Sequence, residues 1–259
     1  MNRILFEKSE IHDGIAVFGG ERAEHVMAVL HGEVGQTLKT GEIDGPIGTG
    51  EILEISGAAG SPSLQLKVRV KHDERSLEPW VDLILAPPRP RVLKRLLPQL
   101  ATMGAGRIIL VGAKKVEKDF WGATLLKEEN YRPLLVDGLM QGGTSILPRI
   151  EGWKSFNRFL REGLPSLAHT RRLVAHPYES SNSDSSICRF VDSSIRNGLN
   201  PPCPNSNSSR LLLAIGPEGG WTDEEVESLE AAGFTRYSLG HRILRTDTAT
   251  IALLARLMD

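Results

Sequence analysis

Two stretches near the end of the chain combine residue types and spacing that could do chemistry. The first is Ile215–Thr222 (IGPEGGWT), which follows an apolar run and precedes Asp223-Glu224-Glu225. The run is typical of a buried strand, and Thr followed three residues later by Glu is the pattern of a capping box at a helix start. Because glycine lets the backbone approach a ligand closely, this is a candidate binding loop; the alternative is an ordinary strand-to-helix turn. It lacks the spacing of a phosphate loop or a dinucleotide-binding loop.

The second stretch is Leu239–Ala249 (LGHRILRTDTA), where another predicted strand is followed by a polar loop and a helix. Thr246 is the expected N-cap of that helix. Arg242 and Arg245 come immediately before it. Each arginine is either a solvated surface charge or a side chain that contacts a substrate, and Arg245, which abuts the cap, is the stronger candidate for contact.

The elements that must position these loops alternate regularly from Trp80 onward. Continuous apolar runs, typical of buried parallel strands, alternate with segments whose apolar residues recur at helical spacing. The alternation predicts an α/β fold, in which helices cover both faces of a parallel sheet and ligands bind at the carboxyl ends of the strands. His176 follows one such strand and is expected to line that edge. The predicted strands are 81–86, 107–112, 172–176, 211–216 and 236–239, and the predicted helices are 92–103, 125–141, 155–164, 223–232 and 246–258.

The first part of the chain has a different pattern. Short strands are predicted at 15–18, 37–43, 48–55 and 63–70, with a short helix at 21–30 and a turn at Asp44-Gly45. Several short strands in so small a segment predict a β-barrel domain at 1–72, joined by a charged linker, 71–79, to a domain at 80–259. A stretch rich in Ser and Asn at about 180–209 is predicted to be a flexible surface insert, or alternatively a regulatory or RNA-contacting loop.

The overall charge is nearly balanced, with 31 Lys and Arg against 32 Asp and Glu and a formal net charge of -1. An RNA partner would therefore need clustered cations. Two clusters are present, and each is either a phosphate-binding surface or a solvated helix face. Their members are Arg89, Arg91, Lys94 and Arg95 in the first, and Arg107, Lys114, Lys115 and Lys118 in the second.

Other features of the sequence indicate where the protein works and whether it binds a metal. No apolar run of about 18 residues predicts a transmembrane helix, and the N-terminus has no apolar core of a signal peptide. Cys188 and Cys203 have neither zinc-site nor disulfide-framework spacing. We expect a cytoplasmic protein without a metal, with an organelle stroma or matrix as the alternative.

The two C-terminal motifs resemble those of a known family. GPEGGWTDEEV at residues 216–226, followed by LGHRILRTDTATIALLA at 239–255, resembles the RsmE family of SPOUT-superfamily methyltransferases, which act on small-subunit (16S-type) ribosomal RNA. The resemblance extends to the N-terminal strands, which are similar to the family's PUA-like RNA-binding barrel. It implies a C-terminal α/β trefoil knot, S-adenosylmethionine as cofactor, a homodimer, and methylation of N3 of one uridine.

The resemblance also implies roles for individual residues. Arg245 is the candidate that stabilises the uridine as it loses its N3 proton, because a nearby cation favours an anion. Glu218 either accepts that proton or anchors the loop, and anchoring is the preferred interpretation. RNA contacts are expected at Arg89, Arg91, Lys94 and Arg242. The cofactor pocket is expected at Ile215, Gly216, Glu218, Gly219, Gly220, Leu239, Gly240 and Leu244, with His176 beside it.

Two segments depart from the family pattern. Residues 98–104 read PQLATMG, so that Gln99 and Thr102 replace the usual Lys and Glu. Residues 140–144 read MQGGT, which keeps Gln141 but has Thr144 in place of the usual Arg. These departures leave two alternatives open: a related SPOUT methyltransferase acting on another RNA, such as tRNA or large-subunit RNA, and a catalytically inactive RNA-binding assembly factor.

Overall fold

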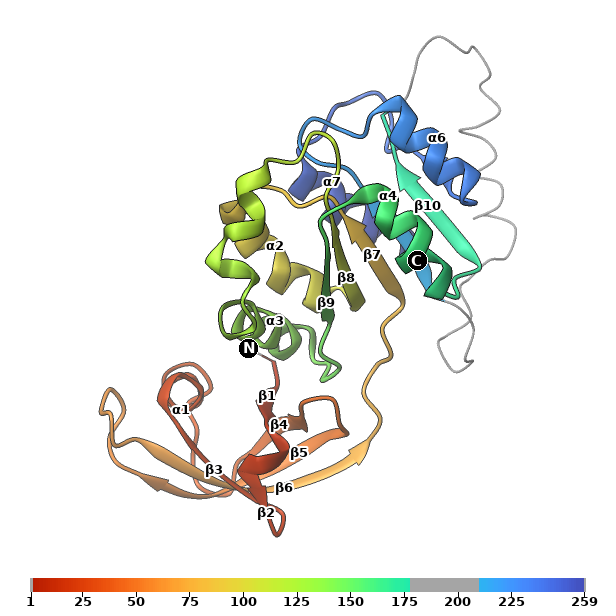
Figure 1. Cartoon of the computed structure of the whole chain (residues 1–259). Helices are drawn as coiled ribbons and strands as arrows, with labels where there is room; N and C mark the ends of the chain where they lie inside the picture. The colour runs from red at the N-terminus through yellow and green to blue at the C-terminus, as the bar shows by residue number, and fades with distance from the viewer. Residues whose placement is uncertain (1, 178–209, 259) are drawn as a thin grey trace.

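The computed structural model of the chain describes residues 2–177 and 210–258, so the predicted insert at 180–209 lies outside the described residues. Two six-stranded sheets form two domains that follow each other along the chain (Figure 1). The N-terminal sheet lies at one end of the molecule, and the second sheet, with the longer helices around it, lies at the other.

The N-terminal domain is a mostly antiparallel sheet with the strand order β1-β4-β5-β6-β3-β2. Its elements are β1 (Ile4–Phe6), β2 (Ile11–His12), β3 (Ile15–Gly19), α1 (Gly20–Ala28), β4 (Thr37–Glu42), β5 (Ile47–Ser56) and β6 (Gln65–Glu74). Apolar residues alternate along β6, and Leu66 and Val68 are fully buried against Phe6. The predicted β-rich domain and the Asp44 turn, where φ is 58°, are confirmed.

The predicted linker at 71–79 is wrong over its first half. Strand β6 continues to Glu74 because His72 pairs with Gly48 and Glu74 with Ile47. A charged sequence is compatible with a strand here, since these residues lie at the edge of the apolar core and their side chains reach solvent. The short strands β1 and β2 were not predicted from the sequence.

The C-terminal domain confirms the predicted α/β class. All strands of its sheet are parallel, in the order β12-β10-β11-β7-β8-β9. The strands are β7 (Val81–Leu85), β8 (Ala105–Val111), β9 (Arg149–Trp153), β10 (Arg171–Ala175), β11 (Leu211–Ile215) and β12 (Thr235–Tyr237). The α-helices are α2 (Pro90–Thr102), α3 (Glu128–Gly142), α4 (Phe156–Arg158), α6 (Asp223–Ala231) and α7 (Thr246–Leu257).

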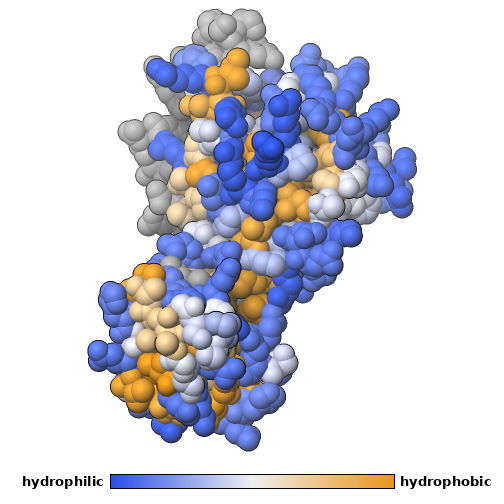
Figure 2. Space-filling model, turned by 90° about the vertical axis from the view of Figure 1, so that its left-hand side faces the viewer, coloured by the Kyte–Doolittle hydropathy of each residue, from blue (hydrophilic) through white to orange (hydrophobic). Residues whose placement is uncertain are grey.

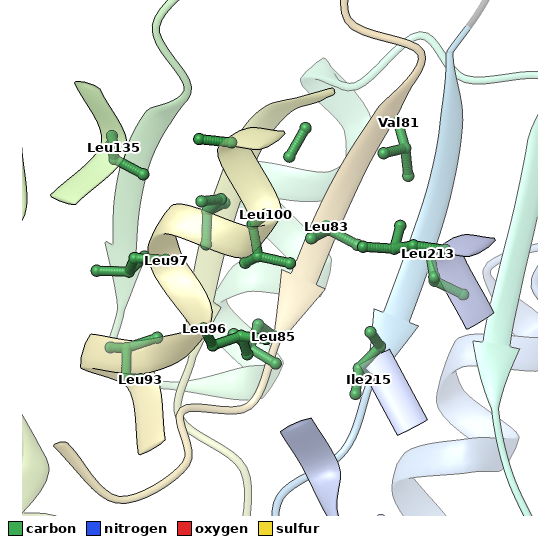
Figure 3. Packing of buried hydrophobic residues seen from close by; sticks show 14 of the residues in the cluster. Val81, Leu83, Leu85, Leu93, Leu96, Leu97, Leu100, Leu135, Leu213 and Ile215 are labelled. Carbon is green, nitrogen blue, oxygen red and sulfur yellow. The ribbon is translucent and has the colours of Figure 1, made fainter. Parts of the chain in front are cut away.

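Helices cover both faces of this sheet (Figure 1). Helices α2, α3 and α7 contribute to one buried cluster, and α4 and α6 to a second cluster across the sheet. The leucine spacing of α2 explains its position: Leu96 and Leu100 point toward Leu85 and Leu83 of β7 (Figure 3). Leu97 projects from the side of α2 on which α3 lies. Burying each such side chain contributes about 1.5–3 kcal/mol, so this interface is a main source of the domain's stability.

Three predicted elements differ from the structure. The helix predicted at 125–141 begins only at Glu128, after a short 3-10 turn. The helix predicted at 155–164 is a single α-helical turn followed by a π-helical turn, Phe159–Gly163, which stops before Pro165, a residue without a backbone N–H. Strand β9 was missed because it is an edge strand whose Arg149 and Glu151 interrupt any apolar run.

The two domains are joined through the chain's first residues and the end of α3. The backbone N–H groups of Asn2 and Arg3 both donate to the Met140 carbonyl, at 2.9 and 3.1 Å. The Arg3 guanidinium donates to the carbonyls of Gly143 at 3.0 Å and Thr40 at 2.6 Å. One arginine therefore connects the N-terminal sheet directly to the C-terminal end of α3.

Candidate active site

The carboxyl edge of the parallel sheet brings the predicted site segments together. Because all six strands run the same way, the loops after β7, β8, β10, β11 and β12 lie at one edge (Figure 1). The two glycine-containing stretches, at 215–220 and 239–245, are both among these loops. His176 is there too, and its backbone N–H donates to the Tyr237 carbonyl at 3.1 Å. The structure therefore places the first loop and His176 at the carboxyl edge, as the sequence predicted, and the second loop lies at the same edge.

The first loop, Gly216–Trp221, is compact and tightly packed. The N–H of Gly220 donates to the Pro217 carbonyl at 2.8 Å, and Gly220 has a φ of 72°, a conformation that favours glycine. A Cβ on Gly216 would lie 3.0 Å from the backbone nitrogen of Trp221. The indole of Trp221 is buried and lies against Gly216 at the start of the loop. A side chain at 216 would therefore crowd Trp221, whereas Gly219 and Glu218 are exposed.

The capping box predicted behind this loop is present and has a further role. The Glu225 carboxylate accepts the Thr222 N–H at 2.9 Å, and Thr222 in turn accepts the Glu225 N–H. The other carboxylate oxygen of Glu225 accepts the backbone N–H of Lys114 at 2.7 Å. Glu225 is 7% exposed, so these hydrogen bonds are shielded from water. A single buried carboxylate therefore joins the loops that follow β8 and β11.

Two basic side chains hold the same loop from the outside. The Lys115 ammonium donates to the Gly219 carbonyl at 2.8 Å. Arg89, the N-cap residue of α2, has its Nε 3.7 Å from Glu218 and 3.6 Å from Glu117. The sequence assigned Arg89 and Lys115 to clusters that could bind phosphate, but here both contact the glycine loop. The contact between Arg89 and Glu218 favours the interpretation of Glu218 as a loop anchor.

The second loop, Ser238–Arg245, presents both apolar and basic side chains. Gly240 has a φ of 109°, which strongly favours glycine, and its N–H donates to the Ser238 hydroxyl at 3.1 Å. Large apolar side chains are exposed in this loop: Leu239 at 39%, Leu244 at 37% and Ile243 at 89%. Apolar and strongly hydrophilic side chains also gather side by side at this end of the molecule in Figure 2. Exposed apolar groups beside a loop of this kind are typical of binding surfaces.

Arg245 is the N-cap residue of α7, and the prediction that Thr246 is the N-cap is wrong. Thr246 is the first helical residue and is buried, and its side chain does not cap the helix. The Arg245 Nε lies 3.5 Å from one carboxylate oxygen of Asp247. The other oxygen is 3.3 Å from Arg95 of α2. Sequence reasoning missed Asp247, since nothing local indicates that α2 and α7 meet there.

The departures from the family pattern lie away from this edge. The Thr102 hydroxyl is 2.9 Å from the carbonyls of both Pro98 and Gly138, where α2 and α3 touch. Thr144 is 8% exposed, and its hydroxyl is 2.9 Å from that of Ser76 at the junction of the domains. Both residues therefore serve packing in this structure.

Within residues 2–177 and 210–258, no three His, Cys, Asp or Glu side chains gather as metal ligands would. No helix within those residues is long and apolar enough to cross a membrane.

The parallel sheet and the two glycine loops at its carboxyl edge define an α/β protein with a candidate ligand site at that edge. Comparison with known protein families identifies which α/β family this is. A family model described as the RNA methyltransferase domain matches residues 75–258. The chain therefore belongs to this family of RNA methyltransferases.

Individual proteins similar to this chain indicate which branch of the RNA methyltransferases it belongs to. The ribosomal RNA small subunit methyltransferase E of Treponema pallidum is 29% identical over 259 residues, which cover 98% of this chain and 90% of that protein. Ribosomal RNA small subunit methyltransferase E 1 of Borreliella burgdorferi is 25% identical, with 97% of this chain and 95% of that protein covered. The predicted membership of the RsmE family is thus confirmed.

Solved structures share the fold along almost the whole chain. A Legionella pneumophila methyltransferase solved with bound SAM has a TM-score of 0.68 at 23% identity, covering 99% of this chain and 96% of that one. Ribosomal RNA small subunit methyltransferase E from Neisseria gonorrhoeae, bound to S-adenosyl methionine, has a TM-score of 0.64 at 18% identity, covering 100% and 97%. At these identities the likeness establishes the two-domain fold alone.

Proposed function

We propose that this chain is an S-adenosylmethionine-dependent methyltransferase that modifies N3 of a specific uridine in small-subunit ribosomal RNA. The observation that carries the proposal is that the 216–221 and 238–245 loops both lie at the carboxyl edge of the parallel sheet, with Arg245 at the end of the second loop. The named relatives support the substrate, and the full-length match supports a role for both domains. Because the substrate is ribosomal RNA, the protein would work in the cytoplasm or in an organelle that contains ribosomes.

The residues at this edge fit the chemistry of the cofactor. Adenosine needs apolar surface for the faces of its base and backbone polar groups for the edges of the base and the ribose. Leu239 and Leu244 offer partly exposed apolar surface, and the glycines at 216 and 219–220 have no side chains that would keep the cofactor away from the backbone. His176 and Ile215 border the same region. When bound there, the cofactor supplies an electrophilic methyl group on its sulfonium.

The residues of the chain then have to bind and activate the uridine. N3 must lose its proton to become a nucleophile, and a guanidinium near the base favours the resulting anion. Arg245 is placed for this role because it is 70% exposed at the end of the second loop. Glu218, which lies near Arg89, anchors the first loop. The rest of the rate acceleration of methyl transfer comes from positioning the base against the methyl group.

RNA contacts are proposed on the exposed face of α2 and on the second loop. Arg91, Lys94 and Arg242 are exposed, and within the described residues none of them has an ion pair. Such cations are available to phosphates, whereas Arg89 already faces two carboxylates. The target base would be unstacked to reach the carboxyl edge.

Three finer features belong to the same proposal. The β-rich N-terminal domain forms a PUA-like barrel that binds RNA, and the segment after β12 is threaded as a trefoil knot. The enzyme is a homodimer, because the exposed Leu239, Ile243 and Leu244 need more cover than one cofactor gives. In a dimer, a second copy would cover part of this apolar surface near each active site.

The test is methyl transfer from labelled S-adenosylmethionine to undermodified small ribosomal subunits, with tRNA and naked ribosomal RNA in parallel. Label at one small-subunit uridine, blocked at N3, would support the proposal. Label on another RNA alone would overturn the substrate, and cofactor binding without transfer to any RNA would favour the inactive assembly factor. Arg245→Ala should lose most turnover, while Arg161→Ala, which removes a similarly exposed arginine at 74%, should not.

A further inference from the structure

Asp247 stands between two arginines that come from different helices. It lies in the first turn of α7, and its side chain is 24% exposed. One carboxylate oxygen is 3.5 Å from the Nε of Arg245 and also accepts the Thr248 N–H at 3.0 Å. The other oxygen accepts a hydrogen bond from Arg95 of α2 at 3.3 Å. Hydrogen bonds from Thr248 and Arg95 thus hold the two carboxylate oxygens of Asp247 in place independently of Arg245.

Arg245 needs such a partner to hold one orientation. Its side chain is 70% exposed, and among the described residues Asp247 is its sole ion-pair partner. An unrestrained arginine side chain has many accessible rotamers, so its guanidinium is spread over many positions. An exposed ion pair contributes little to stability, so a contact of this kind matters more for geometry than for folding.

We propose that Asp247 is a positioning residue, which orients the Arg245 guanidinium toward the target base and is itself held in place by Arg95. The inference deepens the proposed function and rests on it for its kinetic consequences. It also makes a statement about the free protein, namely that the orientation of Arg245 depends on the Asp247 carboxylate.

The simplest competing role for Asp247 is local. An acidic side chain in the first turn of a helix stabilises that helix through the helix dipole. Asp223 is likewise an acidic residue in the first turn of α6, and no arginine within residues 2–177 and 210–258 pairs with it. Asp223→Asn is therefore a matched control, since it removes a first-turn acid and leaves Arg245 untouched.

A double-mutant cycle tests whether Asp247 acts through Arg245. Asp247→Asn should lower kcat about 10-fold, equivalent to about 1.4 kcal/mol, with the cofactor Kd unchanged within about 2-fold. In an Arg245→Ala background the same substitution should change kcat by less than about 2-fold. Arg95→Ala should reproduce part of the loss, and Asp223→Asn none of it. If the losses from Asp247→Asn and Arg245→Ala are additive, Asp247 acts on its own, as a proton acceptor would, and the proposal is overturned.

A second readout separates this inference from the proposed function. The Nε–H signal of Arg245 in a 15N correlation spectrum, assigned by its loss in Arg245→Ala, reports the order of the guanidinium without any substrate. It should broaden or shift to the position of a free arginine in Asp247→Asn and stay unchanged in Asp223→Asn. An unchanged signal in Asp247→Asn overturns the inference even if methylation is found. A changed signal with no methylation of any RNA supports the contact and overturns the proposed function.

Discussion

The Asp82 carboxylate and the His169 imidazole lie 2.9 Å apart at the edge of the parallel sheet opposite to the candidate active site. Their side chains are 2% and 7% exposed. Because a carboxylate only accepts hydrogen bonds, the His169 Nε2 must carry the proton of this bond. Arg210 approaches the other carboxylate oxygen at 3.1 Å, and Arg107 lies 3.8 Å away. One buried carboxylate therefore joins the start of β7, β8, β10 and β11.

The pH dependence of stability should reflect this cluster. Burial acts to raise the pKa of Asp82, but the hydrogen bonds from His169 and Arg210 and the charge of Arg210 outweigh it, so the pKa is lowered. A lowered folded pKa stabilises the fold above the unfolded pKa of about 3.9, and this contribution is lost as the pH falls through the folded value.

Asp82→Asn should accordingly cost about 3 kcal/mol at pH 7, with the difference from the wild type shrinking as the pH falls from about 5 to below 3.9. Urea unfolding at a series of pH values measures both effects. A difference that stays constant over that range would show that the ionised carboxylate is not the stabilising form. Asp119→Asn, at an exposed carboxylate, provides the control.

Removing the charge of Glu225 should weaken cofactor binding and stability together. In Glu225→Gln, one carboxylate oxygen becomes an NH2 group, which cannot accept from both the Thr222 and Lys114 N–H groups. A buried donor left without an acceptor costs about 1–3 kcal/mol, and the loops after β8 and β11 lose their shared anchor. We expect a lower urea midpoint and weaker cofactor binding by calorimetry. Glu227→Gln, an exposed site on the same helix, should change neither measurement.

A side chain at Gly240 should damage the cofactor site more than the fold. At a φ of 109°, Gly240→Ala is strained by about 1–3 kcal/mol, which the loop relieves by moving. The comparison variant is Gly233→Ala, whose φ of 87° imposes similar strain in the turn between α6 and β12. Both variants should lose stability, but Gly240→Ala alone should lose about 10-fold or more in cofactor affinity, or 1.4 kcal/mol. Equal affinities in the two variants would remove the 238–245 loop from the cofactor site.

The junction between the domains predicts a purely structural effect. Thr144→Val keeps the volume of the side chain but removes the hydroxyl that lies 2.9 Å from that of buried Ser76, which, in the part of the chain that the structure describes, then keeps only the Ser145 N–H as a partner. The expected cost is about 1–2 kcal/mol in urea unfolding, with cofactor affinity unchanged. Thr49→Val, on the exposed face of β5, should cost little. A large loss of methyl transfer in Thr144→Val at full stability would instead mean that this departure from the family pattern affects the substrate.

The parts of the structure that the sequence predicted are those with a local pattern. Apolar runs and helical leucine spacing predicted the parallel sheet and α2, and the Thr222–Glu225 pattern predicted a real capping box. Parallel strands then place their following loops at one edge, so the position of both glycine loops at that edge could be predicted as well.

The parts that were missed depend on contacts between distant residues. Lys115 lies 104 positions from the Gly219 carbonyl that it contacts, and its own neighbours in the sequence give no sign of it. The same holds for Asp247 and Arg95, which meet because α2 and α7 pack on one face of the sheet. From the sequence alone, a cation that binds phosphate cannot be distinguished from one that contacts a loop of its own chain. Arg89 and Lys115 were therefore assigned to clusters that could bind RNA.

The strand order also determines how this protein can fold during its synthesis. The N-terminal sheet pairs strands that all lie within residues 4–74, so it can form as soon as that segment has left the ribosome. In contrast, β7 pairs with β11, with Val81 opposite Leu211. The centre of the second sheet therefore cannot be completed until residue 211 has been synthesised. Until then the apolar strands β7 and β8 have one unprotected edge, and contacts this distant in sequence form slowly. The second domain is therefore the part of the nascent chain whose apolar strands stay unpaired longest.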